Sequence, residues 1–261
     1  MKTVPFLDAF SADALPAQLR RAASMKAVRL VAALRKAGLE PEVGYSLAEY
    51  SIYARENSQR MSLSPVFDGT YHSGNANDTM MLYALRGDRA VASCGARLIW
   101  LGTSLADAME SQRFWFGENG APHGDEGCVV TAPTARAIEH MHIAWIGAGS
   151  NFSGEKGAIL PMIRLVNLYA LANWRWTTCV GIAEPEIAYV ENREKPFSRA
   201  HDVYGFASAE ADIRRGDRRF MLMTSPRRYL EACAMSPGYA DIELVAPEPS
   251  ARPDEALKRP A

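Results

Sequence analysis

The residue types best suited to chemistry lie in a segment of small side chains at residues 149–157, between an apolar run and a helical pattern. Small side chains leave backbone N–H groups accessible, and Gly154 and Gly157 let a ligand approach the main chain without a Cβ in the way. The start of the following helix adds unpaired N–H donors and a partial positive charge. The segment therefore predicts an anion site suited to phosphate, to which Lys156 would add a full charge.

The same loop is open to other interpretations. Glycines also make tight strand-to-helix turns that bind nothing. A Walker-type loop needs Gly-Lys-Ser/Thr after a gap of four residues, and here Glu155 follows Gly154, so the lysine is displaced and the hydroxyl is missing. A dinucleotide fingerprint lacks its glycine spacing and its repeated βαβ pattern. Neither nucleotide motif is complete, so nucleotide binding is a third interpretation of this loop, beside the phosphate site and the simple tight turn.

Two histidines and a group of aromatic residues are further candidates. His140 and His142 are two residues apart on an expected strand, so both would project to one face and could act as a base or hold a metal, but no third ligand is evident nearby. Surface or core packing is the alternative for them. The aromatic residues could line an acceptor pocket or an acyl tunnel, or could simply pack between elements. They are Phe114, Trp115, Phe116, Trp174 and Trp176.

Composition excludes several classes of protein. A formal net charge of −1 argues against a dedicated nucleic-acid surface. Four scattered cysteines form no C-x-x-C pair, which argues against structural zinc, and Cys94 and Cys179 lie in apolar runs typical of the core. No signal peptide or membrane-length apolar stretch is evident, so we expect a cytoplasmic protein.

Hydrophobic periodicity predicts the elements that must position these residues. Residues 17–36 form an amphipathic helix with a basic outer face of Arg20, Arg21, Lys26, Arg29 and Arg35. A second helix covers residues 47–61, with Ser46 and Glu49 in a capping-box arrangement. The other expected elements are a hairpin at 79–85 and 90–101, a short helix at 105–116, a strand at 138–148, a long helix from about 158–160 to 174, a strand at 177–182, a short helix at 197–203 and a hairpin at 207–214 and 219–224.

The order of these elements predicts a domain organisation. Residues 1–44 form an N-terminal helical extension, residues 45–235 form the main domain, and residues 102–135 are an insertion between its third and fourth strands. Residues 236–261, rich in Pro, Ala and charge, form a partly disordered tail. The expected fold class is α/β of the α+β type, with a mixed, largely antiparallel central sheet flanked by helices.

At this point the chain resembles the GNAT acyltransferase superfamily. In that fold a strand ends in a loop of form Arg/Gln-x-x-Gly-x-Gly/Ala, whose amides wrap the pyrophosphate of coenzyme A at the start of a long helix. Ser153-Gly154-Glu155-Lys156-Gly157-Ala158 stands at the matching place, with Ser153 in place of Arg or Gln and Lys156 in place of the middle glycine. The resemblance covers about residues 45–225, through element order more than through specific motifs.

The resemblance implies an acyl-CoA-dependent N-acyltransferase with a GNAT-like fold. Its co-substrate would be acetyl-CoA or a longer acyl-CoA, its acceptor a small-molecule or peptide amine, and its partners would include no nucleic acid. The family's general acid is often a tyrosine four residues before a Gly-Phe pair, and counting back from Gly205 gives His201, with Tyr204 adjacent. The candidate catalytic residues are His201, Tyr204 and His142, and the candidate coenzyme-binding residues are Ala148, Ser150, Ser153, Gly154, Lys156, Gly157 and Ala158.

Two alternatives stay open within this resemblance. A catalytically silent acyl-CoA-binding or regulatory module would explain the altered loop. An autoinducer-synthase-like activity would use an acyl-carrier protein as donor, docked on the basic face of helix 17–36. A homodimer is compatible with either.

Overall fold

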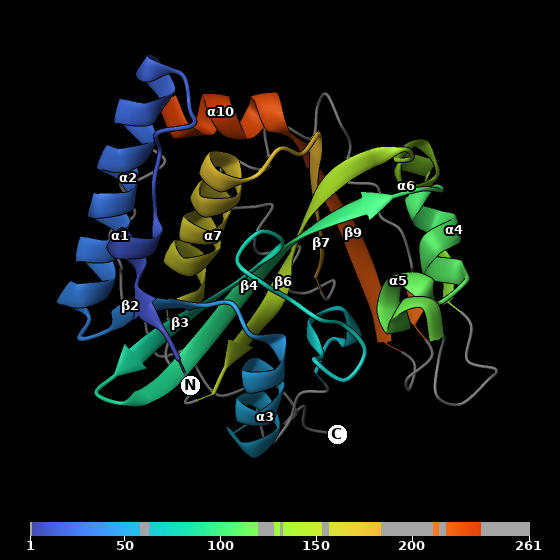
Figure 1. Cartoon of the computed structure of the whole chain (residues 1–261), viewed down its shortest axis with the longest axis horizontal. Coiled ribbons are helices and arrows are strands. Elements are labelled where there is room, and N and C mark those ends of the chain that lie inside the picture. Colours follow the sequence, from blue (N-terminus) through green and yellow to red (C-terminus); the bar gives the residue numbers. More distant parts are fainter. Residues whose placement is uncertain are drawn as a thin grey trace, which may run out of the picture.

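The computed structural model of the chain describes residues 2–57, 63–119, 128–130, 133–152, 157–183, 211–213 and 218–235. Figure 1 shows a sheet with helices packed on it. Within these ranges, no helix is long and apolar enough to cross a membrane.

The strands form a mixed, mostly antiparallel open sheet in the order β1-β2-β3-β4-β6-β7-β9, and β9 also pairs with β8, which pairs with β5. In the described residues, β6 and β7 pair in parallel and the other neighbours are antiparallel. The predicted α+β class is therefore confirmed. The strands are β1 (Val4–Pro5), β2 (Glu40–Gly44), β3 (Thr79–Arg86), β4 (Arg89–Leu101), β5 (Cys128–Val130), β6 (Met141–Asn151), β7 (Thr178–Ala183), β8 (Ala211–Ile213) and β9 (Arg218–Pro226).

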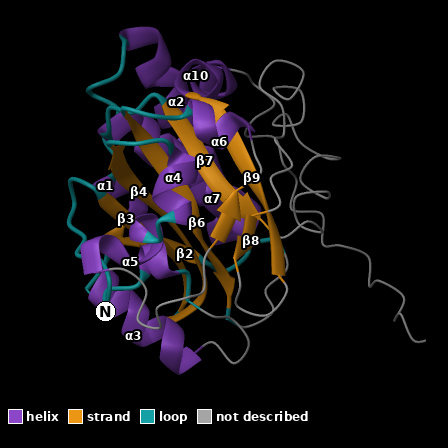
Figure 2. Cartoon of the chain, turned by 90° about the vertical axis from the view of Figure 1, so that its right-hand side faces the viewer, coloured by secondary structure: helices purple, strands orange, loops and turns teal. Residues whose placement is uncertain are grey.

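Helices cover both faces of the sheet. On one face, α2, α7 and α10 pack against each other and against the strands (Figure 1). On the other face lie α3, α4 and α5, with η1 beneath α5; Figure 2 shows α4 and α5 in front of the strands. The helices are α1 (Phe6–Ala9), α2 (Ala17–Lys36), α3 (Leu47–Asn57), α4 (Leu105–Glu110), α5 (Arg113–Phe116), α6 (Pro133–Ala137), α7 (Ile159–Asn173) and α10 (Arg227–Met235), with 3-10 turns η1 (Pro65–Phe67) and η2 (Gly117–Asn119).

The helix predicted at 17–36 is confirmed as α2, with one correction to its outer face. Leu19, Ala23, Leu30 and Leu34 are buried on its inner side, as helical periodicity requires. Lys26, predicted to be on the basic outer face, is buried instead, and its Nζ donates to the carbonyl of Cys233 on α10 at 2.7 Å. A long aliphatic stem lets a lysine cross an apolar interface in this way.

The helix cap and the hairpin were also predictable. The backbone N–H of Glu49 donates to Ser46 Oγ at 3.2 Å, which confirms the N-cap of α3, although α3 ends in the described residues at Asn57. β3 and β4 form the expected hairpin, and Gly87 at its turn has a φ of +59°. Cys94 and Cys179 are buried, as expected.

Three parts of the chain differ from prediction. The helix expected at 105–116 is two helices, α4 and α5, because Gln112 adopts a left-handed φ of 65°. The strand expected at 138–148 begins later, as β6, after the short helix α6 and a positive φ of 48° at His140. Residues 4–44 also supply β1 and β2, two strands that the sequence pattern did not predict.

Other predicted segments fall outside the described residues. These are the short helix at 197–203, most of the strand at 207–214 and the tail at 236–261. The long helix is confirmed as α7, and the strand at 177–182 as β7.

Candidate functional site

The parallel pair β6–β7 separates partway along its length. The two strands pair from Ile143 opposite Thr178 to Ile146 opposite Gly181. Beyond that level β6 continues to Asn151 on β4, and β7 continues to Ala183 on β9. In the described residues the two strand ends therefore pair with their outer neighbours and not with each other. Backbone groups on the inner edges of both strands are thus left for other partners.

A β-bulge in β6 lies where the strands separate. Gly147 pairs with Gly95 and Ser150 pairs with Ser93, so Ala148 and Gly149 together face one residue of β4, Cys94. Ala148 has a φ of 53°, in the left-handed region. Its carbonyl accepts from Ser93 Oγ at 3.1 Å. A bulge of this kind bends a strand and redirects its backbone groups.

The predicted coenzyme-binding residues are divided between the bulge and the start of α7. Ala148 and Ser150 belong to the bulge, and Gly149 between them is exposed, with open space around the position of a Cβ. Gly157 has a φ of +85°, and Ala158 is the buried N-cap of α7 and makes no side-chain cap hydrogen bond. Ser153, Gly154 and Lys156 lie outside the described residues.

Of the three predicted catalytic residues, the structure describes only His142. His201 and Tyr204 lie outside the described residues. His142 is exposed on β6, and its ring centroid is 4.9 Å from that of Trp100 on β4. His140 precedes β6, so strand alternation does not place it beside His142. In the described residues, no group of three or more His, Cys, Asp or Glu side chains could hold a metal ion.

The predicted aromatic cluster is divided by the sheet. Phe114 and Trp115 are buried on the face of α5, where both rings contact Trp145 with centroids 4.5 and 5.9 Å away. Trp174 and Trp176 belong to the core on the opposite face, around α7. The rings therefore do not form one cluster, because the two groups lie on opposite faces of one sheet.

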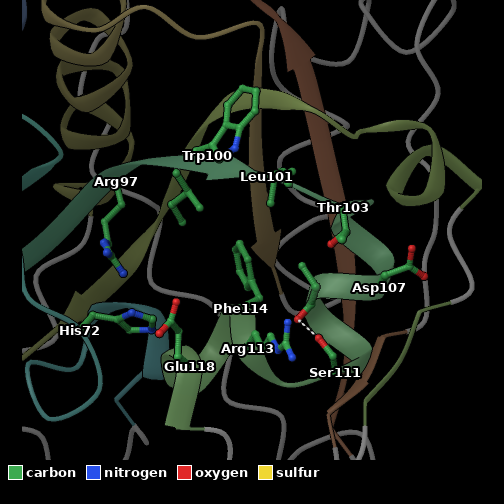
Figure 3. Close-up of a pocket in the computed structure, with 13 residues that line it drawn as sticks. His72, Arg97, Trp100, Leu101, Thr103, Asp107, Ser111, Arg113, Phe114 and Glu118 are labelled. Atoms are coloured by element: carbon green, nitrogen blue, oxygen red, sulfur yellow. Dashed lines mark hydrogen bonds between the residues drawn. The ribbon is translucent and has the colours of Figure 1, made fainter.

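A pocket of about 630 Å³ lies on the face of α4 and α5, beside the second half of β4. Ile99, Leu101 and Phe114 give it an apolar lining. Figure 3 shows His72 and Arg97 on one side of Phe114, and Thr103 and Asp107 on the other. The volume is in the range of small-molecule sites, which also combine an apolar lining with a few polar groups.

Arg97 is the buried charge of this pocket. Its side chain is 9% exposed, and its Nη1 donates to the carbonyl of Val66 at 2.7 Å. Its Nε is buried and has no hydrogen-bond partner, and within the described residues no carboxylate lies within ion-pairing distance of the guanidinium. Burial lowers the pKa of Arg97, and the Asp78 carboxylate, which lies beyond ion-pairing distance, acts in the opposite direction. The guanidinium stays charged at neutral pH because its ordinary pKa is so high.

His72 lies next to Arg97 in the pocket, at the end of a structured turn. The backbone N–H groups of Tyr71 and His72 both donate to the carbonyl of Asp68 at 3.0 Å, and Arg55 Nη2 contacts the Asp68 carboxylate at 2.6 Å. His72 Nε2 lies 2.8 Å from the carbonyl of Trp115. A carbonyl only accepts, so Nε2 carries the proton and Nδ1 keeps its lone pair. Burial, and then the charge of Arg97, lower the pKa of His72, so the ring is neutral at pH 7.

Sequence reasoning missed both Arg97 and His72. One signal for Arg97 was present, because it is the single charged residue in the apolar run at 90–101. Charged side chains inside such a run are rarely buried without a partner. No comparable signal marked His72, which lies in a loop rich in Gly, Ser, Asn and Asp.

Comparisons with protein-family models, with curated proteins and with solved structures gave no match.

Proposed function

We propose that this chain is an acyl-CoA-dependent N-acyltransferase built on a GNAT-like fold. The observation that carries the proposal is the separation of the parallel strands β6 and β7 after Ile146 and Gly181, beside the bulge at Ala148 and Gly149. The start of α7, with Gly157 in a left-handed conformation, follows the end of β6. This arrangement supports the acyltransferase resemblance found in the loop at 153–158.

The separated strands suit an extended thioester carrier. A pantetheine arm carries two amides, which can pair with the inner backbone groups of β6 and β7 in the way that an added strand pairs with a sheet edge. The exposed backbone at Gly149 admits such a chain without a side chain in the way. The N-terminus of α7 then faces the diphosphate end of the carrier, where its N–H groups and dipole favour negative charge.

Acyl transfer to an amine requires a base and an acid. The amine nitrogen forms a bond to the thioester carbon, the carbon–sulfur bond breaks, the amine proton passes to a base, and the departing thiolate takes up a proton. His72 is our candidate base, because its ring is neutral at pH 7 and its Nδ1 has a lone pair. His201 and Tyr204 stay predictions for the acid.

The direct test measures binding of acetyl-CoA and of longer acyl-CoAs to the full chain by calorimetry, and then thiol release with a panel of amines. Gly149→Val is the matched variant, because it places a branched side chain in open space at the bulge and should spare the fold. We expect it to weaken acyl-CoA binding about tenfold or more, by steric block of the main chain. Ala17→Val, on the exposed first turn of α2, is the control and should bind as the original chain does.

Each outcome has a distinct meaning. Failure of every acyl-CoA to bind contradicts the proposal, and binding of ATP in its place favours the nucleotide interpretation. Binding without thiol release for any amine identifies a silent acyl-CoA-binding module. Release from an acyl-carrier protein but not from free acyl-CoA favours the autoinducer-synthase-like alternative.

Charge reversal at Arg21 then tests docking of the carrier protein on α2. It is a better test than reversal at Arg20, whose Nη2 already donates to two backbone carbonyls.

A further inference from the structure

We propose that the pocket over Arg97 binds a small ligand through a carboxylate, with the apolar part of that ligand against Phe114. Naming this ligand as the acceptor, an amine that also carries a carboxylate, rests on the proposed acyltransferase function. The carboxylate site itself does not, because it follows from the charge and shape of the pocket.

The first argument is the state of the guanidinium. Arg97 has nine-tenths of its surface buried, and the one hydrogen bond described for it goes to the neutral carbonyl of Val66. Its Nε is buried without a partner. The Asp78 carboxylate acts on Arg97 only from beyond ion-pairing distance, and it accepts hydrogen bonds from Asn75 and Thr79 instead. A buried charge is costly unless a counter-charge and hydrogen bonds accompany it. A ligand carboxylate would supply both, since the planar guanidinium matches the two oxygens of a carboxylate.

The second argument concerns which anion fits. Arg97 is the buried cation of this pocket, and the neighbouring His72 is neutral, so a single negative charge is matched better than the two charges of a phosphate. The remaining inner wall is apolar, formed by Ile99, Leu101 and Phe114. The ligand is therefore a monoanion with an apolar body, for which the pocket has ample volume.

The third argument is the acidic group at the other end. Asp107 lies across Phe114 from Arg97 (Figure 3). Among the described residues its nearest cation is Arg136, 3.6 Å away, and both side chains are more than half exposed. Exposed pairs at such a distance are weak. The pocket thus presents the Arg97 charge inside and the Asp107 carboxylate across Phe114, which suits a ligand with a carboxylate and an amine. The exposed Glu118, on the same side of Phe114 as Arg97 and His72 (Figure 3), and the exposed Arg113 also line it and carry opposite charges.

The fourth argument is position. Arg97 pairs across β4 and β6 with Trp145, one residue before the last parallel pair, Ile146 and Gly181. Two strand spacings, about 10 Å, therefore separate Arg97 from β7 at the level where the parallel strands part. The pocket lies on the face opposite α7, so an acceptor here and a carrier at α7 would approach the separated strands from opposite faces.

The test of the site uses phenylacetate and its neutral counterpart 2-phenylacetamide, titrated into the full chain without any acyl-CoA. The Nε–H resonance of Arg97, followed by ¹H–¹⁵N NMR, should move with phenylacetate and stay unchanged with the amide. Calorimetry should give at least about tenfold weaker binding for the amide, because the charge-assisted hydrogen bonds are lost. Equal binding of the two compounds, or no binding of phenylacetate, overturns the proposal.

Variants provide a second line of testing. Arg97→Gln should weaken phenylacetate binding about tenfold or more, and Arg113→Gln, an exposed position in the same pocket, should change it far less. Arg97 also donates to the Val66 carbonyl, so its replacement could unfold the protein. Glu118→Gln provides a second test, because Glu118 is exposed and its replacement should not affect folding. Removal of this exposed negative charge should tighten phenylacetate binding about two- to fivefold. Unchanged affinity in Glu118→Gln, together with an unmoved Arg97 resonance, refutes the site.

The assignment of the ligand as acceptor has its own readout. With acyl-CoA present, phenylalanine should release thiol faster than phenylalanine amide, and Arg97→Gln should remove that preference. Phenylacetate binding without acyl-CoA binding supports the carboxylate site and contradicts the proposed transferase function. Acyl-CoA turnover without phenylacetate binding contradicts the carboxylate site and supports the transferase function.

Discussion

Arg97 of β4 lies directly opposite Trp145 of β6, and the Trp145 ring contacts Phe114 of the pocket with centroids 4.5 Å apart. The buried charge and the strand that separates from β7 are therefore direct neighbours in one sheet. Phe67, fully buried, packs close to Gly95 and Gly147 on the same two strands. A ligand against Phe114 would therefore contact a side chain that packs on a ring of the bulged strand.

Phe67 should be a major source of stability at this site. A Cβ at Gly147 would lie 2.7 Å from its ring, so the ring occupies the space that this glycine leaves, while at Gly95 it shares that space with Met81. Phe67→Ala should lower the free energy of unfolding by about 3–5 kcal/mol, through lost burial and a cavity. Urea denaturation measures the effect. Ile52→Ala, at an exposed position on α3, is the control, and a comparable loss there would contradict this role for Phe67.

Gly69 should tolerate no side chain. A Cβ there would lie 2.6 Å from the backbone of Ala48, which cannot rotate away as a side chain can. Gly69→Ala should destabilise the protein by about 1–3 kcal/mol and shift the turn that ends at His72. Gly149→Ala, where the Cβ meets open space, should change stability by less than about 0.5 kcal/mol. Thermal unfolding of the two variants measures this difference. Equal unfolding midpoints would show that the backbone at Ala48 moves away from a side chain at position 69 at little cost.

His72 should make stability depend on pH in the acidic range. Its pKa is lowered in the folded state by burial and by Arg97, while the unfolded chain keeps the ordinary value of 6.5. The unfolded state therefore binds more protons between these two pKa values, and the stabilisation is full above pH 6.5 and is lost as pH falls toward the folded pKa. The carbonyl of Trp115 and the carboxylate of Asp68 act in the opposite direction but do not reverse the shift.

Urea denaturation between pH 5 and 8 measures this dependence, with His72→Gln as the comparison. The variant should lose part of the decline that the original chain shows below pH 6.5. Parallel curves for the two proteins would mean that His72 titrates normally. A direct NMR titration of the ring gives the same information independently of stability.

The Cys179 thiol should be unreactive in the folded protein. It is buried, and burial raises its pKa to about 12, so little thiolate exists at pH 8. Alkylation by iodoacetamide, followed by peptide mass spectrometry, should label Cys179 slowly in buffer and readily in urea. Rapid labelling under native conditions would show that β7 opens to solvent.

The sequence by itself determined the elements whose signals are local. The apolar period of α2, the apolar run of α7 after Pro161, the hairpin around Gly87 and the Ser46 cap of α3 all depend on residues a few positions apart. Such patterns act within one helix or one strand pair, so they can be recognised without the rest of the chain. The mixed, mostly antiparallel class of the sheet was expected as well, although its strands β1 and β2 were not.

Only the tertiary structure decided which chemical groups meet. His72 comes from a loop, Arg97 from a strand and Phe114 from a short helix, and their contact depends on how α4 and α5 pack on one face of the sheet. The same packing placed Trp174 and Trp176 on the opposite face and buried Lys26 against α10. The separation of β6 from β7 likewise depends on which neighbour each strand end prefers. These features depend on contacts between residues that are far apart in the sequence. Their relative stabilities depend on the whole fold, so they cannot be predicted from any short segment.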